Sequence, residues 1–516
     1  MSEGRGAGVL AGSGSNGLAW IGLFVLLKLA VQALGMHGYG YFRDELYYLI
    51  CARHLAWGYV DQPPLSIAVL ALTTRLIGSS LIAIRIVPAL FGAACVGLTG
   101  WITRSMGGGR YAQALAMTAV IVAPVHLAIG QYYSMNAIEL LLWPLAAVAL
   151  SVALARGRTR DWLALGLVLA LGLLNKISML WFVFGAGAGL LLTRQRRVLA
   201  HPGPWIALAL AFALQLPHAL WQASHGWPML EFMRNAAGGK MVAVGVVDFL
   251  RAQVLLMNPL AAPLWIAGLF ALLRARRDPA DRVQGVLFVT VAAILIAAGK
   301  SRASYLSPAY PVLLAAGATV FERTLADGWR RVLRPAAIGV LALGGLLLIP
   351  LSLPVLPEAA FVAYLERLGL RAGGEEHHRY GALPQQYADM HGWRAMADTV
   401  GSVVARLTEE ERRHTVIFAQ NYGEASAINF FRPDLPPCIS GHNNYWLWGP
   451  GPAGTQVVVI LGGRSVDHLK SLARVDSVAM FHAPWVMPYE DSLGVFVCRA
   501  PRQPIPELWK RAKRYE

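Results

Sequence analysis

Residues 83–110 read AIRIVPALFGAACVGLTGWITRSMGGGR. The first 21 residues of this stretch form an apolar run with one charged residue, and two arginines follow in a short glycine-rich turn. A bilayer core of about 30 Å needs roughly 20 apolar residues in a helix, so the run predicts a membrane span. Apolar runs separated by short polar loops recur along residues 17–353, and this pattern decides the fold class.

The composition supports the same interpretation. The chain has 516 residues, of which 56% are hydrophobic and 14% are charged, whereas an ordinary soluble protein has roughly 25% charged residues. Its formal net charge is +16. Only four cysteines occur and none forms a CxxC pair, so the chain has no disulfide framework and no cysteine metal knuckle. These features exclude a plain soluble enzyme, a disordered scaffold and a secreted disulfide-rich domain.

The apolar runs predict about eleven transmembrane helices. Their expected ranges are 17–35, 83–103, 111–127, 135–155, 162–174, 178–192, 203–222, 259–273, 283–298, 305–322 and 335–353. A further apolar segment, 64–78, would reach only about 22 Å as a helix. We expect it to lie in or near the membrane interface, because a crossing there would reverse the sides of all later loops.

The arginines predict the orientation of the chain. One alternating set of loops holds 16 arginines in 43 residues, and the other holds nine lysines and arginines in 99 residues. Positive charge stays on the cytoplasmic side, so the first set faces inward. Residues 1–16 are then a cytoplasmic tail, and residues 36–82 form a loop on the outer face. The charge pattern thus predicts a multi-pass membrane protein whose N-terminus is cytoplasmic.

The last part of the chain, residues 354–516, regains charged residues. Short β-like runs occur at 415–419, 456–461, 477–481 and 495–499, with helix-like stretches between them. This alternation predicts a small α/β domain. An odd number of spans after a cytoplasmic N-terminus places the domain outside, in the periplasm of a Gram-negative cell.

Asp44 and Glu45 are adjacent carboxylates just beyond the first predicted span, among several aromatic residues. Such a pair near a low-dielectric region can act as a base or bind a cation. The alternative is that Asp44 caps the helix expected from residue 44 to 57, with Glu45 stabilised at its N-terminus. The two interpretations are compatible, because a carboxylate at a helix start can also face a cavity.

Other polar residues gather at the predicted outer ends of the spans. Interface snorkelling explains any one of them, but the set indicates an outward-facing cavity with carboxylates and cations. Glu139 is expected to face the protein interior, because exposure to lipid costs a carboxylate roughly 2.5–3.5 kcal/mol. The candidate substrate-binding residues are Asp61, Arg85, Asn136, Glu139, Lys176, Lys300, Arg302 and Tyr305.

The sequence resembles the bacterial members of the dolichyl-phosphate-mannose–protein mannosyltransferase superfamily, which are membrane glycosyltransferases of the GT-C type. The resemblance covers about residues 17–353, and it extends to relatives that transfer aminoarabinose or lipopolysaccharide-core galacturonic acid. It rests on Tyr41-Phe-Arg-Asp44-Glu45, Asp61-Gln-Pro-Pro-Leu65, Arg85-x-x-Pro88, Leu174-Asn-Lys176 and the stretch from Lys300 to Pro311. Weaker similarity lies in 383–390 and 440–446.

The resemblance implies a polyprenyl-phosphate-sugar donor, a site on the outer face and an inverting transfer. Asp44 would be the catalytic base, and Glu45 would orient it or contact the phosphate side. Asp61 would support the site, with a divalent cation as a candidate cofactor and His225 as a second candidate ligand. Aminoarabinose transferases have an arginine and a lysine where this chain has Tyr47 and Gln62. In this chain, the contacts that this arginine and lysine would make with the donor phosphate would have to come from other cations, namely Lys300, Arg302 and Arg85.

We therefore expect a glycosyltransferase whose partners are a donor lipid and a hydroxyl acceptor on a glycan, a lipid or a protein. One alternative is a transporter or flippase for a lipid-linked sugar, which would spread its polar residues through the bilayer midplane. A second is an assembly factor without catalytic activity, which would not need Asp44 and Glu45. The Arg-rich loops are orientation signals, and no nucleic-acid partner is expected.

Overall fold

The computed structural model describes residues 15–275, 279–374, 376 and 379–516, and it divides into two compact units. The helical unit comprises residues 1–38, 82–220 and 243–355, and the sheet unit comprises residues 39–81, 221–242 and 356–516. The predicted domains, 17–353 and 354–516, assigned the loop at 36–82 to the membrane domain. In the structure, residues 39–81 pack with the C-terminal segment.

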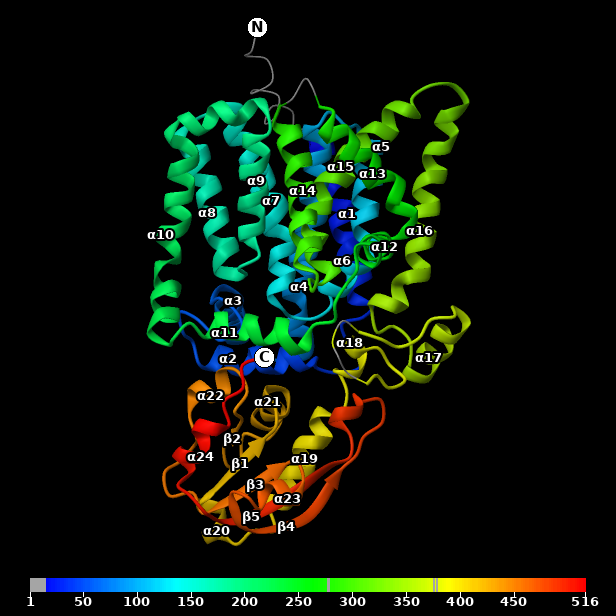
Figure 1. Cartoon of the computed structure of the whole chain (residues 1–516). Coiled ribbons are helices and arrows are strands. Elements are labelled where there is room, and N and C mark those ends of the chain that lie inside the picture. The colour runs from blue at the N-terminus through cyan, green and yellow to red at the C-terminus, as the bar shows by residue number, and fades with distance from the viewer. Residues whose placement is uncertain (1–14, 276–278, 375, 377–378) are drawn as a thin grey trace. The chain divides into compact units, whose positions relative to one another are not determined.

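The helical unit is built from long apolar helices that pack side by side in pairs such as α7 with α8, α9 with α14 and α13 with α15 (Figure 1). The helices are α1 (Ser15–Ala33), α4 (Leu81–Ser105), α5 (Arg110–Ile121), α6 (Pro124–Ile129), α7 (Met135–Arg156), α8 (Thr159–Asn175), α9 (Met179–Leu191), α10 (Pro202–Ser224), α12 (Val246–Leu256), α13 (Ala262–Leu273), α14 (Pro279–Ala298), α15 (Tyr310–Thr324) and α16 (Leu333–Ser352).

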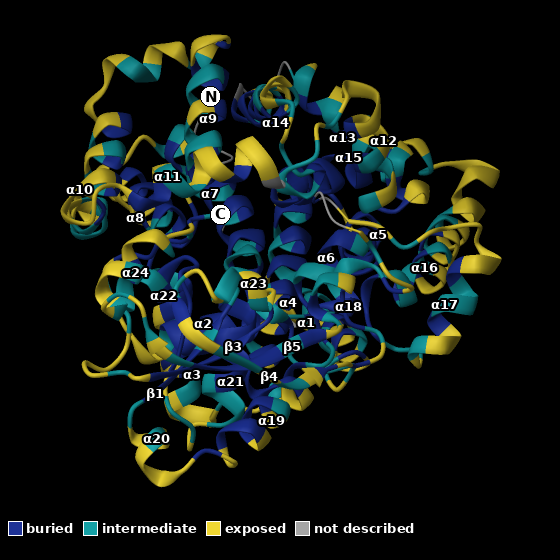
Figure 2. Cartoon of the chain, turned by 60° about the horizontal axis from the view of Figure 1, so that its bottom comes forward, coloured by how far each residue is buried: buried dark blue, intermediate teal, exposed yellow. Residues whose placement is uncertain are grey.

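Helices occupy all eleven predicted spans, although 111–127 is broken into α5 and α6. Among the described residues, five helices are long and apolar enough to cross a membrane, or six if the pair 246–256 and 259–273, bent by 95°, is one span. Helices α10 and α16 leave most of their apolar surface exposed (Figure 2). Lipid contact accounts for such surfaces, so the chain is a multi-pass membrane protein. The count of eleven spans stays a prediction.

Glycines bring α13 and α15 into close contact. A Cβ atom on Gly268 would lie 1.9 Å from the carbonyl oxygen of Leu313, and one on Gly317 would lie 1.9 Å from that of Leu264. Small residues at such positions let two helix backbones approach, which is a common way to hold membrane helices together. Backbone packing of this kind is therefore part of what holds the helical unit together.

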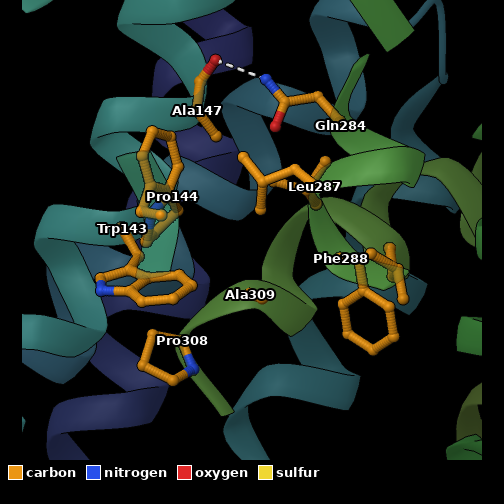
Figure 3. A pocket seen from close by; sticks show the side chains of 11 residues that line it. Trp143, Pro144, Ala147, Gln284, Leu287, Phe288, Pro308 and Ala309 are labelled. Atoms are coloured by element: carbon orange, nitrogen blue, oxygen red, sulfur yellow. Dashed lines mark hydrogen bonds between the residues drawn. The ribbon is translucent and has the colours of Figure 1, made fainter. Parts of the chain in front are cut away.

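Figure 3 shows the interior between α7, α9, α14 and the segment that precedes α15. The amide of Gln284 donates a hydrogen bond to the carbonyl oxygen of Ala147 at 2.9 Å. The cavity beside it, lined by Trp143 and Phe288 among others, has a volume of about 10 Å³. That is room for about one water molecule, so this cavity is part of the packed core and holds no substrate.

The sheet unit combines a mixed sheet with short helices. Its helices are α2 (Arg43–Arg53), α3 (Leu65–Ile77), α11 (Pro228–Asn235), α17 (Glu358–Arg367), α18 (Gln385–Ala388), α19 (Trp393–Val404), α20 (Glu409–Arg413), α21 (Tyr422–Phe431), α22 (Asn444–Trp448), α23 (Ser465–His468) and α24 (Ile505–Arg511). Its strands are β1 (Thr415–Ala419), β2 (Cys438–Ile439), β3 (Val457–Leu461), β4 (Leu472–Phe481) and β5 (Leu493–Pro501).

The five strands lie in the order β2-β1-β3-β5-β4. Strand β1 pairs in parallel with β2 and β3, whereas β5 pairs antiparallel with β3 and β4. The predicted C-terminal α/β region is thus confirmed. Strand β4 begins at Leu472, five residues before the predicted β-like run at 477–481. The strand lies at the sheet edge and only its two end residues are buried, so the polar residues between them hid the period-2 signal.

Candidate functional site

Helix α2 begins in the segment that carries the predicted catalytic pair. Its first three residues are Arg43, Asp44 and Glu45, and two carboxylates in a first turn favour the helix start through its dipole. The Oε2 atom of Glu45 accepts a hydrogen bond from the backbone nitrogen of Phe42 at 2.9 Å. The side chain of Glu45 is fully buried. Glu45 therefore makes the reach-back half of a capping box and fixes where the helix begins.

Asp44 is placed differently, because 35% of its side chain is exposed. The phenol of Tyr422, at the start of α21, donates a hydrogen bond to Asp44 Oδ1 at 2.8 Å. Burial raises the pKa of Tyr422, so this hydroxyl stays protonated and remains a donor. No residue that the structure describes donates a hydrogen bond to Asp44 Oδ2. The carboxylate is thus held at one oxygen, and the other is available to accept a proton.

Arg43 contacts both Asp44 and residues of the C-terminal segment. Its guanidinium is 3.5 Å from Asp44 Oδ1 and 3.6 Å from Asp389 Oδ2, and it donates a hydrogen bond to the hydroxyl of Tyr489 at 2.8 Å. It also lies over the ring of Tyr422, 5.6 Å from the ring centre. Burial raises the pKa of Asp389 to about 6, although the neighbouring Arg43 opposes the shift. The cation therefore connects the predicted base to the C-terminal part of the chain.

Asp61 is held by residues from the same compact unit. Its Oδ1 accepts a hydrogen bond from the hydroxyl of Tyr47 at 3.1 Å, and its Oδ2 accepts one from the amide of Asn443 at 3.3 Å. Asn444 donates to both Tyr47, at 2.5 Å, and Asp61, at 3.4 Å. The ring of Tyr47 lies 4.5 Å from that of Tyr422, centre to centre. The contact between these two tyrosine rings thus connects the environment of Asp61 to that of Asp44.

A second pair of carboxyl groups lies at the start of α21. The amide of Asn421 donates to Glu424 at 2.8 Å and to Glu490 at 2.9 Å. Burial raises the pKa of Glu424 to about 7. Burial and the adjacent Glu424 raise the pKa of Glu490 well above its usual value. Because like charges close together disfavour full ionisation, this pair holds a proton near neutral pH.

Four of the predicted substrate-binding residues meet in the helical unit. Lys176 Nζ is 2.7 Å from Glu139 Oε2 and 2.8 Å from Asn136 Oδ1. It also lies 4.4 Å from the ring centre of Tyr305. The hydroxyl of Ser178, which was not predicted, donates to the other oxygen of Glu139. The carboxylate is buried and paired, as the cost of exposing it to lipid predicts.

The remaining predicted cations take other positions in the helical unit. Arg85 is fully buried and donates to the carbonyl oxygens of Met36 at 3.4 Å and Gly38 at 3.2 Å. It therefore secures the chain where it leaves α1. Lys300 is exposed and Arg302 is half-buried, in the turn between α14 and the 3₁₀ segment Ala303–Ala309. Whether all these groups face one outward cavity stays a prediction.

The two candidate metal ligands, Asp61 and His225, do not belong to a group of potential ligands among the residues that the structure describes. His225 is exposed, its ring stacks on Trp221 with centres 4.1 Å apart, and its Nδ1 is 2.8 Å from the carbonyl oxygen of that residue. Within the described part of the chain, no group of three or more His, Cys, Asp or Glu side chains is placed to hold a metal ion. The hydrogen-bond donors to Asp61 described above are a phenol and two amides.

Sequence reasoning missed the contributions of Tyr422, Asn443, Asn444 and Asp389. For Asp389, Asn443 and Asn444, the available signal was the similarity of 383–390 and 440–446 to bacterial relatives, for which no chemistry could be assigned. Tyr422 lies outside both ranges, and no signal in the sequence marked it. The structure also shows that Gln62 is buried, and that no described residue forms a hydrogen bond with its side-chain amide. An amide presents both a donor and an acceptor, which suits a hydroxyl group.

Comparison with known proteins was made at the level of families and of solved structures. Residues 61–221 match the model of the dolichyl-phosphate-mannose-protein mannosyltransferase family. No curated protein matches the chain in sequence.

The structure is similar to ArnT from Cupriavidus metallidurans. With the apo form it shares 16% identity and a TM-score of 0.59, and with the form bound to undecaprenyl phosphate it shares 14% and 0.58. Both alignments cover 93% of this chain and 98% of the other. The oligosaccharyltransferase AglB from Archaeoglobus fulgidus aligns with a TM-score of 0.50 and 11% identity, over 86% of this chain and 69% of the other. The chain therefore has the fold of the GT-C superfamily of membrane glycosyltransferases, and residues 61–221 match its dolichyl-phosphate-mannose-protein mannosyltransferase family.

Proposed function

We propose that this protein transfers a sugar from a polyprenyl-phosphate-linked donor to a hydroxyl group of a cell-envelope acceptor, with inversion at the sugar. The observation that carries the proposal is the environment of Asp44. It is the partly exposed carboxylate at the start of α2, held by Tyr422 at one oxygen and with its other oxygen open. The similarity to ArnT bound to undecaprenyl phosphate supports a polyprenyl-phosphate donor.

In the proposed reaction, the oxygen of the acceptor hydroxyl attacks the anomeric carbon of the donor sugar. Asp44 Oδ2 removes the proton of that hydroxyl as the new glycosidic bond forms. The bond between the anomeric carbon and the phosphate oxygen breaks, and polyprenyl phosphate leaves with the electron pair. Cations that hold the phosphate make an acid unnecessary, because charge-assisted hydrogen bonds stabilise the departing oxygen.

We assign the phosphate contact to Lys300 and Arg302. Both lie in the turn before the segment Ala303–Ala309, where Lys300 is exposed and Arg302 is half-buried. Glu45 is assigned to positioning α2, and Asp61 to positioning Tyr47 through their hydrogen bond. The acceptor is a hydroxyl on a glycan, a lipopolysaccharide or a protein. The reaction is proposed for the outer face of the inner membrane, with the N-terminus cytoplasmic and the sheet unit in the periplasm.

The test is a lipid analysis of cells that lack the gene. We expect the polyprenyl-phosphate sugar to accumulate in these cells and to disappear when the intact gene is returned. An Asp44→Asn variant should leave the lipid accumulated, because a positioned base contributes about 10²- to 10⁴-fold to the rate. Asp398→Asn, at an exposed aspartate of α19, is the matched control and should restore turnover. Full consumption of the lipid by Asp44→Asn would refute the base assignment.

The phosphate contact is tested separately with Lys300→Ala in proteoliposomes that contain a labelled donor. We expect a higher KM for the donor with a smaller change in kcat, because the charge binds the phosphate before the reaction as well as during it. Arg251→Ala, at an exposed arginine on α12, is the control. An unchanged donor KM for Lys300→Ala would remove this residue from the site.

A further inference from the structure

The sheet unit contains a cavity of about 280 Å³ that the proposed reaction does not use. It lies between one face of the sheet and helix α24. Its floor is formed by alternate residues of β1 and β3, and its roof by the apolar side of α24. The side chains that matter here are Phe418, Val458, Ile460, Leu472, Leu508 and Trp509.

The two faces of the sheet differ in how well they are covered. Helices α19 and α21 pack against the sheet and bury Val459 and Leu461 of β3 completely. The neighbouring Val458 and Ile460 point to the opposite face and keep 6% and 7% of their surface exposed. Helix α24 has only seven residues, which is too short to cover this face. The cavity is therefore the part of this apolar sheet face that helix α24 leaves uncovered.

Its size and lining suit a hydrocarbon chain. A cavity of roughly 150 Å³ lined by aliphatic and aromatic side chains binds benzene, with six carbons. Scaling by volume, about 280 Å³ holds about eleven carbon atoms. Apart from the indole N–H of Trp509, which donates to the carbonyl oxygen of Trp446, the polar groups at the lining belong to Asp467, His468, Ser471 and Arg511.

The charges at the rim are mostly positive. Asp467 is neutralised by Arg464 at 2.9 Å and by Lys470 at 2.8 Å. Arg511 is exposed, and no residue in the described ranges makes a hydrogen bond or an ion pair with it. Lys510 is exposed beside it. An anionic group at the mouth of the cavity would therefore be attracted by Arg511, while the charge of Asp467 is offset by its two ion pairs.

We propose that this cavity binds a single-chain fatty carboxylate, with the hydrocarbon chain between β3 and α24 and the carboxylate beside Arg511. The apolar lining takes the chain, and the basic rim selects an anion over a neutral alcohol of the same length. The inference is independent of the proposed glycosyl transfer, because no residue of the cavity belongs to the environment of Asp44.

The test uses the full-length protein in nanodiscs and a photoreactive undecanoic acid with a diazirine near the end of its chain. Peptide mapping should place the label in 457–472 and 505–512. Linear carboxylates of increasing length should compete, with affinity rising about fourfold per methylene up to about eleven carbons and then levelling off. A rise that continues without a plateau would indicate membrane partitioning and would overturn the proposal.

Two variants and a control complete the test. Ser471→Phe fills the cavity from its rim and should abolish labelling, whereas Val466→Phe, at a residue that is 62% exposed, should not. Arg511→Gln should weaken competition by the carboxylate at least fivefold and leave competition by undecanol unchanged. Thermal unfolding of each variant confirms that it is folded. Labelling that survives both Ser471→Phe and Arg511→Gln, or that maps elsewhere, would refute the site.

Discussion

The buried pair of Lys176 and Glu139 leads to a quantitative prediction. The two charges are 2.7 Å apart, and their side chains are 9% and 5% exposed. Removing one partner of a buried ion pair leaves an uncompensated charge and typically costs about 3–5 kcal/mol. We therefore expect Lys176→Met and Glu139→Gln each to lower the free energy of unfolding by about that amount.

The double variant should behave differently from the sum of the single variants. With both charges gone, neither side chain has to be ionised in the interior, and replacing a whole buried pair is often close to neutral. We expect the double variant to lose about 1–2 kcal/mol, so that the coupling energy of the cycle is several kcal/mol. The free energies can be measured by reversible unfolding with SDS in mixed micelles.

An exposed ion pair in the same unit is the control for this cycle. Arg251 and Asp248 on α12 are 3.9 Å apart, with side chains that are 75% and 72% exposed. Exposed pairs contribute about 0–1 kcal/mol, so the cycle of Arg251→Met and Asp248→Asn should show little coupling. Additive losses at Lys176 and Glu139, equal to the sum of the single variants, would refute the claim that the two residues stabilise each other.

Three further variants test other contacts. Tyr422→Phe removes the hydroxyl that donates a hydrogen bond to Asp44, and we expect kcat to fall about 10- to 100-fold with little change in the KM for the sugar donor. Tyr364→Phe on α17 is the control, for which we expect an unchanged kcat. Burial raises the pKa of Glu424 from 4.5 to about 7, so the folded state binds more protons than the unfolded state. The contribution of Glu424 to the free energy of unfolding is therefore greatest below pH 4.5 and is lost as the pH rises through 7. The Glu424→Gln variant should show a flatter decline, and above pH 7.5 its free energy of unfolding should exceed that of the native protein by about 3 kcal/mol at most. An unchanged pH profile of unfolding would contradict the assignment. Gly268→Ala places a methyl group against the carbonyl oxygen of Leu313 and should destabilise the protein by about 1–3 kcal/mol, whereas Gly187→Ala meets no atom within 4 Å and should be neutral or stabilising.

Part of the candidate site was predictable from local sequence. Asp44 and Glu45 were identified because two carboxylates at a helix start beside an apolar span are unusual, and both are found in the first turn of α2. The different burial of the two side chains was not predictable from local sequence. The structure buries Glu45 against the backbone of Phe42 and leaves Asp44 partly exposed, and this difference depends on how α21 packs against α2.

Patterns along the sequence were enough to predict the apolar helices and the C-terminal α/β region. Hydrophobicity and side-chain period are local properties that add up along a segment, so a span or a strand can be recognised without knowing its neighbours. Tertiary structure alone decided that Tyr422 donates to Asp44, 378 residues away, and that Lys176 pairs with Glu139, 37 residues away. Such contacts depend on which elements pack together and in which register. A hydrogen bond about 3 Å long is created or lost by a shift of a single residue, which leaves hydropathy almost unchanged.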